Sequence, residues 1–106
     1  MSEHILTDET FDTEIAAATT PFMVEFFATW CGHCKRMAPI IKEVSAELEG
    51  KVKIFIADVD VATKKTTDFG VSATPTMVLF KDGKPVKEIV GERSKEDLIK
   101  ELEALL

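Results

Sequence analysis

The stretch Thr29-Trp30-Cys31-Gly32-His33-Cys34-Lys35 decides the fold, because a strand pattern ends there and a helix pattern begins. It contains both cysteines of the 106-residue chain, its only tryptophan and one of its two histidines. The preceding residues 22–28 form a short apolar run rich in aromatic residues, which predicts a buried strand. After the stretch, apolar residues recur every three or four positions, which predicts a helix with one buried face. These residues are Met37, Ile40, Ile41, Val44 and Leu48.

The predicted position of the cysteines favours thiol chemistry. A helix N-terminus carries unpaired backbone N–H groups and partial positive charge, and both lower the pKa of a cysteine placed there. Cys34 follows Cys31 by three residues, so one helical turn brings the two side chains to the same side. Because helical side chains tilt toward the N-terminus, we expect Cys31 to be the exposed, attacking thiol and Cys34 the shielded, resolving thiol.

Other uses of a cysteine pair fit the sequence less well. A disulfide between neighbours one turn apart closes a very small loop, so it would constrain the unfolded chain little. A zinc site needs about four ligands, and His33 and His4 supply no second ligand pair at the usual spacing. Covalent haem attachment requires a histidine directly after the second cysteine, where this chain has Lys35. We therefore predict a redox-active dithiol and no metal site.

Composition limits the possible partners. A chain of this length predicts one domain, residues 1–106, with a hydrophobic core of its own. The net charge of −6 argues against nucleic acid and against anionic membrane surfaces, since both require clustered positive charge. Residues 1–9 lack the pattern of a secretory signal, and no apolar run approaches the ~20 residues of a membrane span. We expect a cytoplasmic protein.

The rest of the chain alternates strand and helix patterns. We predict a strand at His4–Leu6 and a helix at Thr10–Ala18 capped by Thr7 or Asp8. The helix after the cysteines should reach Glu49 and end at Gly50. The other expected elements are strands at 52–57, 77–80 and 85–90, the last two joined by a turn at Asp82-Gly83, and helices at 62–69 and from Ser94 onward. The order β-α-β-α-β-α-β-β-α predicts an α/β fold with a central mixed sheet and helices on both faces.

Glu25 is the one charged residue within the strand that leads to the cysteines. In a strand with one solvated face it would point outward. Its neighbours are apolar on both faces, however, so it could instead be buried, and burial would raise the pKa of its carboxyl and suit it to accept a proton near the cysteines. The residues alone leave both interpretations open.

Taken together, the sequence closely resembles the thioredoxin family over essentially its whole length. The specific matches are 26–35, Ala38-Pro39, Thr74-Pro75-Thr76 and 80–83. The resemblance implies the thioredoxin fold, a monomer, and a cis peptide bond before Pro75, next to the cysteines. It also implies substrate-binding residues, namely Trp30, Gly32, Ala73, Thr74, Pro75 and Gly91.

The resemblance also bears on Glu25 and His33. Glu25 occupies the position of a buried acid in the family, which implies that it takes the proton from Cys34. A lysine that often accompanies this acid is replaced by Ile56. The motif Cys31-Gly32-His33-Cys34 is similar to that of disulfide isomerases, whereas ordinary thioredoxins have proline in place of the histidine. An imidazole there would stabilise the Cys31 thiolate and make the disulfide a better oxidant.

The leading hypothesis is a thiol-disulfide oxidoreductase that reduces disulfides of protein substrates and is recharged by a thioredoxin reductase. It would need no cofactor beyond the Cys31–Cys34 disulfide. The first alternative, suggested by His33, is a disulfide oxidase or isomerase in an oxidising compartment. The second is a non-catalytic binding subunit that uses the fold as a docking surface.

Overall fold

The computed structural model describes residues 3–106. Residues 1 and 2 belong to the predicted domain and to the segment that lacks the pattern of a secretory signal, but they lie outside the described part. Within that part, five strands and four helices follow in the predicted order. Their bounds are β1 Glu3–Leu6, α1 Phe11–Ala17, β2 Phe22–Phe27, α2 Gly32–Glu47, β3 Lys53–Asp58, α3 Thr63–Asp68, β4 Thr76–Lys81, β5 Lys84–Val90 and α4 Lys95–Glu103. The predicted α/β class is confirmed.

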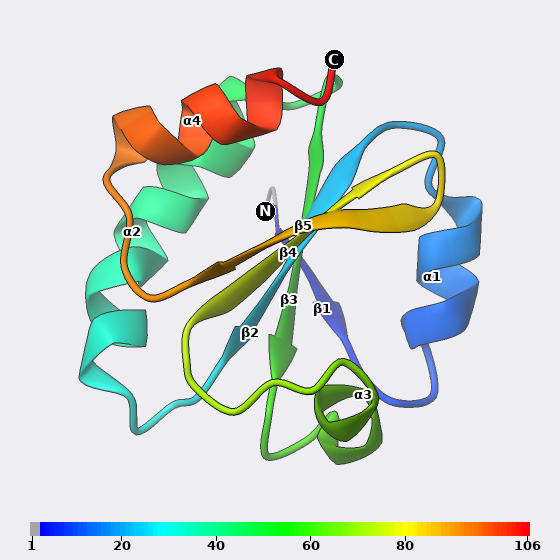
Figure 1. Cartoon of the computed structure of the whole chain (residues 1–106), viewed down its shortest axis with the longest axis vertical. Coiled ribbons are helices and arrows are strands. Elements are labelled where there is room, and N and C mark those ends of the chain that lie inside the picture. Colours follow the sequence, from blue (N-terminus) through cyan, green and yellow to red (C-terminus); the bar gives the residue numbers. More distant parts are fainter. Residues whose placement is uncertain (1–2) are drawn as a thin grey trace.

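The strands form one mixed sheet in the order β1-β3-β2-β4-β5 (Figure 1). β3 pairs in parallel with both β1 and β2, as crossover helices require, and β4 runs antiparallel to both β2 and β5. β2 is therefore the central strand, and the cysteine motif follows its carboxyl end.

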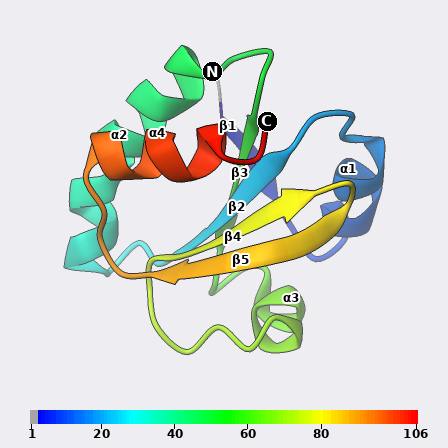
Figure 2. The ribbon, with the colours of Figure 1, turned by 45° about the horizontal axis from the view of Figure 1, so that its top comes forward.

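Helices cover both faces of the sheet, with α2 and α4 on one and α1 and α3 on the other (Figure 2). Successive residues of β2 point to opposite faces. Met23 packs with residues of α2 and α4, whereas Phe22, Val24 and Phe26 pack with Phe11 of α1 and the rest of an aromatic cluster. Because β2 is covered on both sides, Glu25 has no solvated face to point to.

Helix capping differs from the sequence prediction at α1. Its N-cap is Thr10, whose side chain forms no capping bond within the helix and instead bonds to Thr7. Asp8 acts elsewhere, because its carboxylate accepts the backbone N–H groups of Lys64 and Lys65 at the start of α3. The prediction used only the residues next to the helix in the sequence, whereas the tertiary structure brings the start of α3 to Asp8.

Two other boundaries depend on glycine. α2 ends at Glu47 rather than Glu49, and Gly50, at φ +85°, lies in the turn that leads to β3. The hairpin turn is confirmed, with Asp82 at φ 54° and Gly83 at φ 75°, the positive values that a tight turn between twisted strands needs. Ser94 is the N-cap of α4 and accepts the backbone N–H of Asp97, as predicted.

Candidate active site

Cys31 is the N-cap residue of α2. Its backbone is extended (φ −89°, ψ 119°), and its sulfur accepts the backbone N–H of Cys34 at 3.2 Å. This N–H belongs to the first helical turn, where no carbonyl within the helix is available to it. The Cys31 thiol also donates to the carbonyl oxygen of Thr74 at 3.4 Å. The sulfur thus replaces the oxygen of an ordinary capping side chain, and the same N–H would stabilise a thiolate.

The pKa values of the two thiols move in opposite directions. For Cys31, burial raises the pKa, but hydrogen bonds with the side chains of Cys34 and Thr74 and with the backbone of Cys34 and His33 outweigh it, and the pKa falls below its ordinary value. For Cys34, burial is the largest cause and the hydrogen bond with Cys31 adds to it, which raises the pKa to about 11. Cys31 is therefore the stronger acid, and Cys34 holds its proton at neutral pH.

Exposure does not distinguish the thiols as strongly as the sequence predicted. Cys31 is 7% exposed and Cys34 5%, and both are free thiols. The expected contrast between an exposed and a shielded sulfur is wrong in this respect, because Ala28 and the Thr74 loop also cover Cys31. The two thiols also differ in their hydrogen bonds, because Cys31 alone occupies the N-cap position of α2.

Glu25 is buried, at 4% exposure, on the α2 face of the sheet. Its register partners are Ile56 of β3 and Met77 of β4, so the family's lysine position is filled by an apolar side chain. Glu25 and Cys34 line the same small cavity, of about 100 Å³, together with Phe27, Ala38, Ile41 and Ile56. A cavity of this size can hold water, which would connect a carboxylate to a thiol.

The Thr74–Pro75 peptide bond is cis, and Pro75 is buried. The N–H of Gly91 donates to the Pro75 carbonyl at 2.8 Å, which ties the end of β5 to this loop. Gly91 adopts φ +93°, a left-handed conformation that side chains disfavour. Thr74 is half-buried and contacts Cys31 through its carbonyl, whereas Ala73 is exposed.

Trp30 is 69% exposed directly before Cys31. Its indole N–H donates to Asp60 Oδ2 at 2.9 Å, and the Asp60 backbone N–H is in turn held by Asp58 at 2.9 Å. The ring is thereby fixed in orientation while its surface remains open to solvent. Gly32, the next predicted binding residue, is also exposed.

His33 lies on the surface in a cluster that the sequence did not predict. Its Nδ1 is 2.5 Å from Glu92 Oε1 and 2.8 Å from Arg36 Nη2. Arg36 donates to the same carboxylate oxygen from Nε at 2.9 Å and from Nη2 at 2.7 Å. Hydrogen bonding to Arg36 first, and then to His33, lowers the pKa of Glu92 to about 2.

Three polar residues of this site were therefore missed in the sequence. Arg36 is one helical turn after His33, so its contact follows from helix spacing. Asp60 and Glu92 reach the motif from the ends of β3 and β5. No local pattern indicates either contact, because both arise from the order of strands in the sheet.

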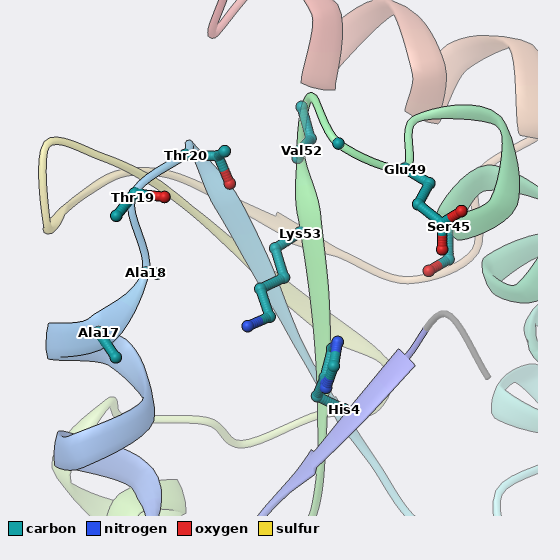
Figure 3. Close-up of a pocket in the computed structure, with 10 residues that line it drawn as sticks. His4, Ala17, Ala18, Thr19, Thr20, Ser45, Glu49, Val52 and Lys53 are labelled. Carbon is teal, nitrogen blue, oxygen red and sulfur yellow. The ribbon is translucent and has the colours of Figure 1, made fainter.

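A larger cavity lies away from the cysteines. Its volume is about 350 Å³, and it lies between β1, the start of β3 and the ends of α1 and α2. Figure 3 shows His4, Lys53, Thr19, Thr20 and Glu49 among the side chains around it. None of its lining residues belongs to the cysteine motif.

Within residues 3–106, no group of three or more His, Cys, Asp and Glu side chains could hold a metal ion. No helix in the same range is both long and apolar enough to cross a membrane.

Comparison with known proteins agrees with this geometry. The family model described as thioredoxin matches residues 2–104. The chain belongs to the thioredoxin family. A thioredoxin from Mycolicibacterium smegmatis is 46% identical over 99 residues, covering 92% of this chain and 88% of that protein. A thioredoxin from Staphylococcus aureus is 40% identical over 98 residues, covering 92% of each.

Membership of the thioredoxin family makes this protein a thiol-disulfide oxidoreductase. Its redox-active group is the pair Cys31 and Cys34, and thioredoxins generally require no other cofactor. One further relative, from Mycobacterium leprae, is named a bifunctional thioredoxin reductase/thioredoxin and is 38% identical over 97 residues, covering 92% of this chain and 21% of that protein.

Proposed function

We propose that this protein reduces disulfides of other proteins as a single-domain, monomeric, cytoplasmic thioredoxin and is recharged by a thioredoxin reductase. The observation that carries this proposal is the capped Cys31 sulfur, which accepts a helix N–H next to a second thiol of high pKa. The relative named a bifunctional thioredoxin reductase/thioredoxin supports a thioredoxin reductase as the partner.

The reaction begins at Cys31. Its thiolate attacks one sulfur of the substrate disulfide, the S–S bond breaks, and one substrate thiolate leaves, which gives a mixed disulfide. The substrate chain binds around this sulfur, in contact with Trp30, Gly32, Ala73, Thr74, Pro75 and Gly91. The Thr74 carbonyl, which receives the Cys31 thiol in the free protein, becomes available to the backbone of the substrate.

Cys34 completes the reaction. Its thiol loses a proton, attacks the Cys31 sulfur and releases the second substrate thiolate, so two electrons pass from the dithiol to the substrate. A pKa of about 11 leaves this thiol almost fully protonated at neutral pH. Glu25, on the same cavity, accepts the proton through water.

His33 gives the runner-up, an oxidase or isomerase in an oxidising compartment. A histidine beside Cys31 would stabilise the thiolate and thus the reduced form of the protein. In the structure the imidazole bonds to Glu92, and the His33 group that lowers the pKa of Cys31 is its backbone. This geometry favours the reductase.

Reduction of insulin disulfides with NADPH and a bacterial thioredoxin reductase tests the proposal. We expect turnover in the wild type and none in Cys31→Ser, with Cys34→Ser trapped as a mixed disulfide. A titration of the redox equilibrium against glutathione distinguishes the two candidates. Failure to turn over with the reductase, together with a strongly oxidising potential, would favour the oxidase or isomerase.

A further inference from the structure

Glu92 contacts both His33 and Arg36 at the start of α2. It follows Gly91 in the connection between β5 and α4, and its carboxylate oxygen Oε1 contacts His33 Nδ1 at 2.5 Å and Arg36 Nη2 at 2.7 Å. The Glu92 side chain is only 34% exposed, although His33 and Arg36 are 63% and 61% exposed. Its carboxylate is thus held against the first turn that follows Cys31.

The connection that carries Glu92 is anchored on both sides. The Gly91 N–H donates to Pro75, and the Arg93 N–H donates to the Met37 sulfur at 3.4 Å. The Arg93 guanidinium donates to the Glu92 carbonyl at 2.8 Å and to the Val90 carbonyl at 3.3 Å. These bonds fix the backbone of Glu92 relative to the cysteine helix and to the Thr74 loop.

The contacts of the imidazole indicate which tautomer His33 adopts. Nδ1 can either donate to Glu92 or accept from Arg36, but one nitrogen cannot do both at once. The contact with Glu92 is the shorter, and Arg36 already gives two donor groups to Glu92, so we assign a proton on Nδ1 that is directed at the carboxylate. The imidazole is therefore oriented by Glu92.

The charge of this cluster reaches Cys31. The Arg36 pKa is raised first by its hydrogen bond with Glu92 and, among smaller causes, by the charge of Cys31, so the guanidinium and the sulfur interact. The Glu92 carboxylate, which contacts both Arg36 and His33, contributes negative charge to the same cluster. Negative charge near a thiolate opposes its formation, whereas the positive charge of the Arg36 guanidinium favours it.

We propose that Glu92 is a positioning residue for the redox reaction: it holds His33 and Arg36 and offsets the positive charge of Arg36 beside Cys31, so the dithiol remains reducing despite its histidine. This inference rests on the proposed function as a reductase. It accounts for a motif with histidine in a chain whose relatives are thioredoxins.

The equilibrium with glutathione expresses the consequence. The reduced protein and oxidised glutathione give the Cys31–Cys34 disulfide and two molecules of reduced glutathione, with two electrons transferred. A more stable Cys31 thiolate favours the reduced protein and makes its disulfide a stronger oxidant. Removal of the Glu92 charge should act in this direction, and removal of the Arg36 charge in the opposite one.

The test uses Glu92→Gln in the full chain at low ionic strength. We expect alkylation of Cys31 by iodoacetamide at pH 6 to become about two- to fivefold faster, an effect in the range of exposed charge pairs. The glutathione equilibrium should shift toward the reduced protein by roughly the same factor. Glu92→Asp keeps the charge and should restore most of the wild-type behaviour.

Two further variants make the result decisive. Glu101→Gln is the matched control, because Glu101 is similarly exposed (36%) and pairs with Lys87 on another part of the surface; it should change neither readout. Arg36→Gln should slow alkylation and shift the equilibrium toward the oxidised protein. Urea unfolding checks that each variant is folded.

The inference is overturned if Glu92→Gln matches the wild type in both readouts, or if it slows alkylation. It is also overturned if Arg36→Gln moves the readouts in the same direction as Glu92→Gln. None of these measurements needs a reductase or a protein substrate. A wild type that fails to reduce insulin therefore overturns the proposed function alone.

Discussion

Replacement of Glu25 by glutamine should slow the second half of the reaction and leave the first half intact. The pKa of Cys34 is about 11, so at pH 7 only about one molecule in 10⁴ carries the Cys34 thiolate. A positioned general base typically contributes about 10²- to 10⁴-fold, so we expect Glu25→Gln to slow the attack of Cys34 by about 10²-fold or more. The pKa of Cys31 is lowered by hydrogen bonds that do not involve Glu25, so Cys31 should react at its wild-type rate.

Stopped-flow reaction with an aromatic disulfide that releases a coloured thiolate separates the two steps. The first release reports the attack by Cys31, and the second reports the resolution by Cys34. In Glu25→Gln the second phase should accelerate about tenfold per pH unit between pH 7 and 10, because hydroxide must then generate the thiolate. The wild type should show a flatter profile.

Cys34→Ser sets the baseline without resolution, and Ser45→Ala is a control for loss of a buried polar group on α2, since Ser45 is 2% exposed. Glu25→Leu provides a second variant that removes the acid with an apolar side chain. A second phase in either Glu25 variant with the wild-type rate and pH profile would refute a proton-transfer role for Glu25.

Three other predictions follow from the same contacts. The pKa of Glu92 is lowered to about 2, so the ionised carboxylate stabilises the fold above the unfolded pKa near 4.5, and this stabilisation is lost as the pH falls toward 2. In urea unfolding, Glu92→Gln should be less stable than the wild type at pH 7, and the difference should close by pH 2. A difference that is the same at both pH values would contradict this. Asp60→Ala removes the acceptor of the Trp30 N–H, so fluorescence anisotropy of the only tryptophan should show a freer ring, and an unchanged decay would count against the tether. Phe26→Ala empties a fully buried position among Phe11 and Phe69 and should cost about 3–5 kcal/mol of unfolding free energy, whereas a loss under 1 kcal/mol would mean that the site collapses to fill the space.

Local patterns in the sequence predicted most of the fold. The apolar run at 22–28 and the spacing from Met37 to Leu48 specify a buried strand and an amphipathic helix, whose junction must contain Cys31 and Cys34. The turn at Asp82-Gly83 and the cap at Ser94 also depend on neighbours only. Boundaries shifted by one or two residues, because helix ends depend on the contacts that compete for the last backbone groups.

The chemistry of the individual residues was also visible in the sequence, but their environments were not. Glu25 could have pointed to solvent or into the core, and only the pairing of β2 between β3 and β4, with α2 above it, buried it beside Cys34. Cys31 was expected to be exposed, but packing against the Thr74 loop covered it.

The sequence by itself determined that two thiols stand one turn apart at the start of a helix, because strand and helix periods are short-range properties. Only the tertiary structure decided what surrounds them. Thr74, Asp60 and Glu92 come from three separate connections that the order of the sheet brings to one end. Their electrostatic effects act through space over a few ångströms, whereas dozens of residues separate them from the cysteines along the chain, so no local pattern could encode them.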